Sequence, residues 1–192
     1  MIKGYYTGVG SRETPQDILN FMIEVGYKMA QLGYTGRSGS AAGADSAFEQ
    51  GFVDYQNFKA TKSTLATFEA YLPWKGFSDI KEDDIHIVTP NLSNYNEAVV
   101  IASTIHPIWT KLKRGAQALH TRNVYQVLGL DLKTPSKVLF CYAQPTKNRQ
   151  GEITGVKGGT NTAVQLALNN NIKVYNFYFQ EDIDKVKQLL KI

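Results

Sequence analysis

Three glycine-rich segments of the sequence have the residue types that hold a phosphate group. They span residues 8–12, 38–45 and 158–162, and each stands at a predicted strand-to-helix junction. Glycine lets a backbone come close to an anion and supplies positive φ angles where a turn needs them. The free N–H groups and the dipole at a helix start favour negative charge. The three segments therefore predict phosphate-binding loops.

Side chains within these turns extend the expected set of contacts. The Arg12 guanidinium can form a bidentate pair with a phosphate. Asp45 opens a predicted helix, where its carboxylate either accepts hydrogen bonds from a ribose or base or caps the helix. The predicted ligand-binding residues of the turns are Gly10, Ser11, Arg12, Ser38, Gly39, Ser40, Gly43, Asp45, Gly158, Gly159, Thr160 and Thr162. No turn matches GxGxxG or GxxxxGK[ST], which disfavours ordinary NAD sites and P-loop NTPase sites.

Alternating strand-like and helix-like segments would bring these turns to one edge of a sheet. We expect strands at residues 4–9, 34–37, 66–72, 85–88, 137–143 and 172–179. We expect helices at residues 14–32, 44–55, 94–105, 111–128, 160–168 and 182–190, with a polar loop at 144–157. Several strands are apolar throughout, which favours a mostly parallel sheet with helices on both faces. The prediction is an α/β fold, a single Rossmann-like domain over residues 1–192, with its ligand at the carboxyl ends of the strands.

The composition is that of an ordinary globular protein. The chain has 192 residues, of which 43% are hydrophobic and 20% charged, and this balance excludes disorder along its whole length. The net charge of +4 suits an anionic small molecule and permits nucleic-acid binding without demanding it. No apolar run approaches the roughly 18–20 residues that cross a bilayer, and the first residues enter a strand-like run. We therefore expect a soluble, cytoplasmic protein with no membrane partner.

Histidine and cysteine spacing gives no metal site. His86, His106 and His120 lack the spacing of metal ligands, and Cys141 is the single cysteine. We therefore predict no metal and no cofactor. The single cysteine also excludes an internal disulfide, and its apolar surroundings predict a buried thiol.

Basic and aromatic residues near the predicted turns are weaker candidates for ligand contact. Lys147, Arg149 and Lys157 precede the third turn and could form a basic rim or lid over phosphates. Tyr71 and Trp74 stand at the end of a predicted strand, where an aromatic ring could stack on a base. Each of these residues equally fits an ordinary solvated loop or a core position.

The turns resemble those of the SLOG superfamily, a Rossmann-like group that includes the DNA-processing protein DprA and the LOG nucleotide phosphoribohydrolases. Residues 9–12 resemble the first turn of that family. Residues 38–39 and 43–45 resemble its Ser-Gly-Gly-Ala-x-Gly-Ala-Asp motif, with Ser40 where a second glycine is usual. Residues 158–163 resemble its last turn. The resemblance covers most of the chain and implies a pocket for nucleotides, nucleotide-derived signals or nucleic-acid phosphates.

A further stretch resembles the stand-alone DprA-like proteins of bacteriophages. It comprises residues 120–123 and 126–129. This resemblance adds Arg122 and Asn123 to the predicted ligand-binding residues, and it makes His120 a weaker candidate. Members of the superfamily are often dimers or larger, so the resemblance also implies a homo-oligomer.

The third turn departs from the motif of the LOG enzymes. Those enzymes cleave an N-glycosidic bond with a glutamate and an arginine near Pro-Gly-Gly-x-Gly-Thr-x-x-Glu. Here residues 161–165 read Asn-Thr-Ala-Val-Gln and place no carboxylate in the first helical turn. A glycosidase needs a carboxylate to activate water or stabilise the transition state. Catalysis of the LOG type is therefore disfavoured, and the candidate substitutes are Asp45, Glu49, Glu69 and Glu97.

Three functions remain open on these residues. The favoured one is binding of a phosphorylated nucleotide or nucleotide-derived ligand, such as a signalling nucleotide. The second is an N-glycosidase or deoxyribosyltransferase acting on a nucleotide, with its catalytic residues unknown. The third is DprA-like binding of single-stranded DNA, although the sequence has no dense stripe of lysine and arginine.

Overall fold

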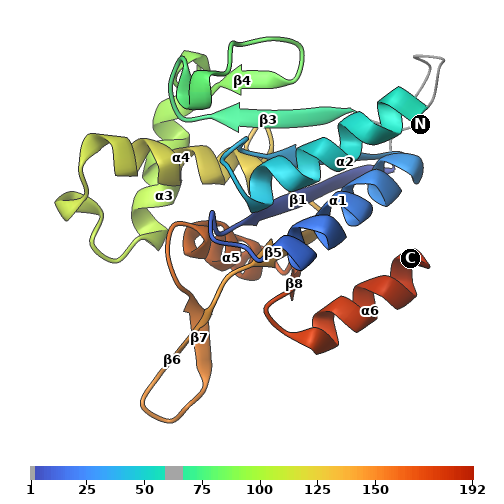
Figure 1. Ribbon diagram of the computed structural model, residues 1–192. Coiled ribbons are helices and arrows are strands. Elements are labelled where there is room, and N and C mark those ends of the chain that lie inside the picture. Colours follow the sequence, from blue (N-terminus) through green and yellow to red (C-terminus); the bar gives the residue numbers. More distant parts are fainter. Residues whose placement is uncertain (1–2, 59–66) are drawn as a thin grey trace.

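The computed structural model describes residues 3–58 and 67–192, and a six-stranded sheet forms its centre (Figure 1). All neighbouring strands of this sheet pair in parallel, in the order β4-β3-β2-β1-β5-β8. The strands are β1 (Gly4–Gly10), β2 (Tyr34–Ser38), β3 (Phe68–Leu72), β4 (His86–Val88), β5 (Val138–Tyr142) and β8 (Lys173–Asn176). The predicted α/β class with a parallel sheet is confirmed.

Six α-helices of the described residues cover the two faces of the sheet. One face carries α1 (Gln16–Gln31), α2 (Ala44–Phe58) and α6 (Gln180–Leu190). The other face carries α3 (Tyr95–Ile105), α4 (Arg114–Leu128) and α5 (Thr160–Asn169). Side chains alternate between the faces along a strand, so Phe140 packs with the first group while Leu139 and Cys141 pack with the second. The Cys141 thiol is buried, as predicted.

The order of the strands contains one change of direction. From β1 the chain builds outward through β2, β3 and β4, and it then returns to the other side of β1 to add β5 and β8. The ends of β1 and β5 are joined where Ser11 N donates to Tyr142 O at 3.0 Å. A crevice at such a switch point is where open parallel sheets bind ligands.

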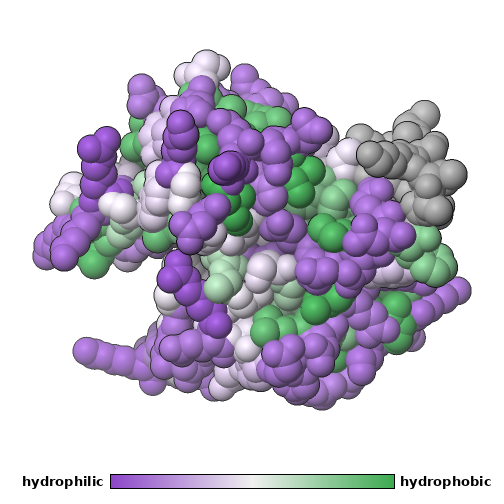
Figure 2. Space-filling view, turned by 45° about the horizontal axis from the view of Figure 1, so that its top comes forward, coloured by the Kyte–Doolittle hydropathy of each residue, from purple (hydrophilic) through white to green (hydrophobic). Residues whose placement is uncertain are grey.

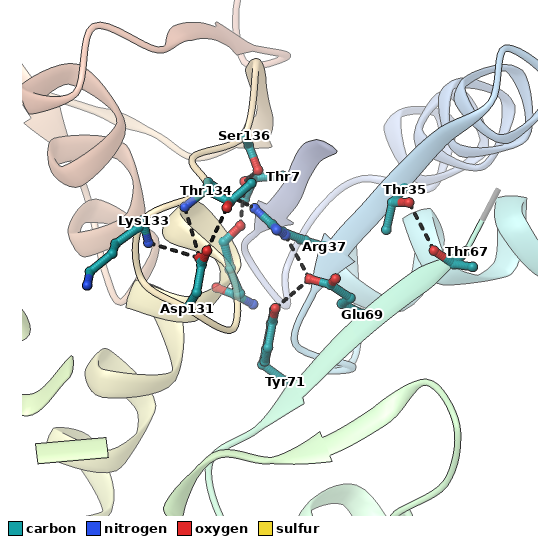
Figure 3. A network of polar contacts seen from close by, with 11 residues as sticks. Thr7, Thr35, Arg37, Thr67, Glu69, Tyr71, Asp131, Lys133, Thr134 and Ser136 are labelled. Atoms are coloured by element: carbon teal, nitrogen blue, oxygen red, sulfur yellow. Dashed lines mark hydrogen bonds and ion pairs between the residues drawn. The ribbon is translucent and has the colours of Figure 1, made fainter. Parts of the chain in front are cut away.

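A buried polar network fixes α4 and the loop that follows it against the sheet (Figure 3). Thr7 Oγ1 donates to Gln126 O at 2.6 Å and is paired with the Ser136 hydroxyl at 2.9 Å. Arg37, which is 2% exposed, pairs through Nε with Glu69 at 2.8 Å and donates from Nη1 to Thr134 O at 2.6 Å. The network therefore sets the position of the helix that borders the switch point.

Residues 144–157 are not the polar loop that we expected. They contain the antiparallel hairpin of β6 (Pro145–Lys147) and β7 (Ile153–Val156), which projects from the molecule (Figure 1). Asn148 Oδ1 accepts hydrogen bonds from Gln150 N and Glu152 N, both at 3.0 Å, and so closes the turn. The prediction failed because the buried residues of the hairpin strands, Gly155 and Val156, are adjacent, so the apolar alternation of a half-buried strand is missing.

Other boundaries shift by a few residues. The helix expected from 111 begins at Arg114, after the short turn of 3-10 helix at Trp109–Lys111. The strand expected over 172–179 ends at Asn176, after which Phe177 N makes a last bond to Cys141 O at 2.7 Å. The Asn176 N–H bonds to Asp182 Oδ2 at 2.9 Å. Further 3-10 turns lie at Phe77–Asp79 and Thr89–Asn91. The first residue of the strand expected at 66–72 lies outside the described residues.

Over residues 3–58 and 67–192, no helix is both long enough and apolar enough to span a membrane.

Candidate functional site

A cleft of about 710 Å³ lies at the switch point, between α4 and the ends of β1 and β5. Figure 2 shows the molecule hollowed at its left side, with hydrophilic residues around the recess. The cleft is lined by nine of the predicted ligand-binding residues, namely Gly10, Ser11, Arg12, Asp45, Arg122, Asn123, Gly158, Gly159 and Thr160. These predicted residues come from four separate segments of the chain, and the fold brings them together in one cavity.

Five predicted residues do not line the cleft: Ser38, Gly39, Ser40, Gly43 and Thr162. Gly39 and Gly43 instead permit close packing behind it. A side chain at residue 39 would collide with the Arg122 guanidinium, and one at residue 43 would lie 2.7 Å from Ser11 O. Gly43 also has a φ of +93°, which other residues rarely adopt. Most residues of the second turn thus pack behind the cleft and do not face a ligand bound in it.

The hydroxyl groups of this set bond within the protein. Ser38 Oγ donates to Gly8 O at 2.6 Å, and Ser40 Oγ donates to Glu49 Oε2 at 2.6 Å. The Thr162 hydroxyl is paired with His120 Nδ1 at 2.7 Å. These three hydroxyl groups therefore stabilise the turns around the cleft.

The start of α5 offers an open site for an anion. A side chain added at Gly159 would meet no atom within 4 Å, so nothing within the protein crowds this turn. Asn123 Nδ2 donates to Gly159 O at 2.9 Å and fixes the turn against α4. Arg12 and Lys157 are exposed and also line the cleft. The helix dipole and these two cations favour negative charge here.

A buried ion pair forms the floor of the cleft. Arg122 Nη1 lies 3.3 Å from Asp45 Oδ2, and each side chain is 6% exposed. Burial raises the pKa of Asp45 more than the Arg122 charge and the Gly10 N–H lower it. Burial also lowers the pKa of Arg122, which the Asp45 charge opposes. Arg122 Nε is buried and has no hydrogen-bond partner in the described part of the chain.

The Gln126 amide joins this pair to its neighbours. Oriented with its oxygen toward the second turn, it accepts from Gly39 N at 2.9 Å and from Arg122 Nη1 at 3.2 Å. Its nitrogen then donates to Asn123 Oδ1 at 3.0 Å. Gln126 was not among the predicted residues, although it stands one helical turn after Arg122 on the same face of α4.

His120 lines the cleft as a neutral imidazole. Burial, together with the nearby charges of His106 and Arg122, lowers its pKa to about 4. Its ring lies against that of His106, with 4.4 Å between the centroids. Among the described residues no group of three or more His, Cys, Asp or Glu side chains could hold a metal ion.

The carboxylates weighed as catalytic substitutes lie in different places. Glu49 bonds to Ser40 and, at 2.9 Å, to His86 Nε2, and Glu69 belongs to the Arg37 network. Neither of them lines the cleft, and nor does Glu97 on α3. Asp45 does, as does Glu13, which we did not predict. Glu13 follows the first turn directly, so its position in the sequence was the signal for it.

The predicted rim and stacking residues fall largely outside the cleft. Lys157 lines it, but Lys147 and Arg149 belong to the hairpin and do not. Tyr71 is fully buried, and Trp74, which is 40% exposed, does not line the cleft.

The tyrosines that do line the cleft are Tyr142 and Tyr178. Neither tyrosine was among the predicted residues. Tyr142 is the last residue of β5, and Tyr178 follows β8 by two residues. A position at the carboxyl end of a predicted strand was therefore their only signal.

Comparison with solved structures identifies proteins of similar fold. The Moco carrier protein of Chlamydomonas reinhardtii matches with a TM-score of 0.50 and 20% identity, over 91% of this chain and 75% of the other. A second structure of the Chlamydomonas molybdenum cofactor carrier protein matches with a TM-score of 0.39 and 18% identity, over 98% and 97% of the two chains. DNA processing protein A from Helicobacter pylori, described as binding single-stranded DNA, matches with a TM-score of 0.38 and 14% identity, over 97% and 81%.

The first of these likenesses shows a fold shared with the Moco carrier protein, and the resemblance to the SLOG superfamily stays a prediction. This likeness does not extend to the bacteriophage-type subgroup, which stays a prediction. No family model and no curated protein matches the chain.

Proposed function

We propose that this protein binds a phosphorylated nucleotide or nucleotide-derived ligand in the cleft at the switch point. The observation that carries the proposal is the convergence of two glycine-rich turns with Arg12 and Lys157 on one cavity. A volume of about 710 Å³ falls within the range of small-molecule sites. The ligand phosphate lies at the start of α5, where the open turn at Gly159 leaves room for it.

The charges of the cleft support an anionic ligand. Asp45 and Arg122 neutralise each other at the floor. The exposed groups that remain are Arg12, Lys157 and Glu13, so cations exceed anions at the surface that a ligand meets. Charge-assisted hydrogen bonds from such cations to phosphate are among the stronger polar contacts in proteins.

Binding without catalysis fits the carboxylates of the cleft best. Asp45 is held by Arg122 and by Gly10 N, which donates to its Oδ1 at 3.2 Å, so it is committed to the protein. Glu13 is exposed to solvent. One protein with this fold is by name a cofactor carrier, but at 20% identity that likeness bears only on the fold.

Arg12→Ala tests the cation of the first turn. Isothermal titration with AMP, ADP-ribose and a cyclic dinucleotide finds the ligand class that binds the unchanged protein. With that ligand we expect about 10- to 100-fold weaker binding for Arg12→Ala, the range for a hydrogen bond to a charged group. Arg149→Ala removes an arginine outside the cleft and keeps the affinity. Equal affinities for the two variants would place the phosphate elsewhere.

Gly159→Asp tests the turn at the start of α5. The space around Gly159 accommodates a side chain, so the variant folds and places a carboxylate where the phosphate would lie. We expect loss of detectable binding, while Gly159→Ala, which adds volume without charge, binds within a few-fold of the original protein. Retained binding in Gly159→Asp contradicts the proposed anion site.

Two further measurements separate the alternative functions. Mass spectrometry of the incubated nucleotides recovers them unchanged if the protein only binds, and it detects free base if the protein is an N-glycosidase. Single-stranded DNA binding would appear as a gel shift at physiological salt that weakens steeply as salt rises.

A further inference from the structure

Two tyrosines, Tyr142 and Tyr178, form an aromatic wall of the cleft on the side of β8. Tyr178 is 43% exposed, although most large aromatic side chains of the described residues are buried or half-buried. Its ring lies 5.9 Å from that of Tyr142, at 47°, and 5.5 Å from that of Phe179, at 81°. The Tyr142 and Phe179 rings pack against the Tyr178 ring and restrict its movement, while Tyr178 still lines the cleft.

Asn176 holds this wall in place. The side chain is 6% exposed and joins the ends of β5 and β8, because Nδ2 donates to Ala143 O at 2.7 Å and Oδ1 accepts from Ala143 N at 3.0 Å. The same Oδ1 accepts from Tyr178 N at 3.2 Å. The backbone of Tyr178 is therefore tied to the strand that carries Tyr142. A ring held in this way loses little freedom when a ligand binds to it.

The polar groups and the aromatic wall lie on connected elements. Lys157, next to the third turn, donates from Nζ to Gln144 Oε1 at 2.8 Å, and Gln144 stands two residues after Tyr142. Ser11 of the first turn bonds to Tyr142 O. The candidate phosphate-binding groups and the exposed Tyr178 ring therefore share one lining, which suits a ligand with a charged end and a planar end.

We propose that Tyr178 is the stacking platform for the planar heteroaromatic ring of the ligand. The inference rests on the proposed function, since it assigns the second half of a ligand whose phosphate lies at the glycine-rich turns. Stacking uses the π-face that every nucleobase has, so it selects a ring-bearing phosphate over a bare sugar phosphate without selecting one base. Tyr178 is thus a specificity-determining residue of the cleft.

The test compares a ligand that has a ring with one that lacks it. AMP and ribose 5-phosphate share a phosphate and a ribose, and they differ in the base. We expect Tyr178→Leu to weaken AMP binding about 5- to 100-fold, the range that a base–aromatic stack contributes. Ribose 5-phosphate binding stays within twofold. Tyr178→Phe retains the ring and retains AMP affinity within a few-fold.

Trp74→Leu is the matched control, because Trp74 is exposed to a similar degree, 40%, and lies outside the cleft. It leaves both affinities unchanged. If Tyr178→Leu lowers neither affinity, or lowers both alike, the stacking inference fails while the phosphate site stands. If neither compound binds the unchanged protein, and GMP, CMP, UMP, ADP-ribose and a cyclic dinucleotide do not bind it either, the proposed function fails and the inference with it.

Discussion

Burial shifts the pKa of several single residues in the cleft. His120 gives the clearest effect that a measurement of stability against pH can detect. Its folded-state pKa is about 4, while the unfolded value is 6.5. The unfolded chain therefore binds more protons between these values, and His120 contributes stability that is lost as the pH falls from about 6.5 to 4. The loss is at most about 3 kcal/mol, the free energy that corresponds to a pKa change of this size.

We predict that His120→Gln flattens this part of the stability curve. Glutamine keeps a group that can bond to the Thr162 hydroxyl but does not titrate. Urea unfolding at a series of pH values from 4 to 8 measures the difference between the variant and the original protein. His86→Gln is the contrasting control. Although burial opposes it, hydrogen bonds to Asp83 and Glu49 raise the His86 pKa, so its contribution is lost as the pH rises. The same slope for both variants would contradict the assignment.

At the scale of elements, the crossing of α1 and α2 sets how closely the helices cover the sheet. A side chain at Gly26 would lie 2.6 Å from Phe48 O, and one at Gly51 would collide with Ile23 O and lie 2.7 Å from Tyr27 N. The crossing therefore depends on two glycines whose lack of a side chain lets the backbones approach. This helix crossing packs on the face of the sheet formed by β1 and β2, the strands that the first two turns follow.

We predict that Gly51→Ala destabilises the protein by about 1–3 kcal/mol. Overpacking of this size outweighs the gain of up to about 1 kcal/mol that alanine has over glycine within a helix. Gly115→Ala, also in a helix, is the matched control, because its nearest neighbour would be Trp74 at 4.0 Å. The control should keep or raise the midpoint of urea unfolding. Unchanged stability in Gly51→Ala would show that the helices separate at little cost.

At the scale of the whole molecule, the two hydrophobic clusters share the strands of one sheet. Tyr6 and Phe140 belong to one cluster, and Val9 and Leu139 belong to the other, on the same two strands. If these strands unfold on one side of the sheet, the hydrophobic cluster on the other side also becomes exposed to solvent. The predicted homo-oligomer stays a prediction at this scale, and light scattering measures it directly.

We predict a single cooperative unfolding transition, as expected for one domain. Far-ultraviolet circular dichroism and tryptophan fluorescence should give the same urea midpoint and the same dependence on urea concentration. Trp74 packs against Phe77, while Trp109 packs beside the cluster of α3, α4 and α5, so fluorescence samples two regions. Two separate midpoints would contradict the single domain.

The sequence by itself determined the class of fold and most of the polar groups of the cleft. Apolar strands and helical spacing are local patterns, and they predicted the parallel sheet. The chemistry of the turns at predicted strand ends, which depends on adjacent residues, predicted seven residues that line the cavity, and the family resemblance added Arg122 and Asn123.

Only the tertiary structure decided which other side chains face that cavity. Tyr178, Gln126 and Glu13 line it because β8, α4 and the first turn meet at the point where the strand order reverses. Glu49 and Trp74 are similar in type but face other neighbours. Which residues meet depends on the crossing of segments far apart in the chain, and no local pattern contains that information.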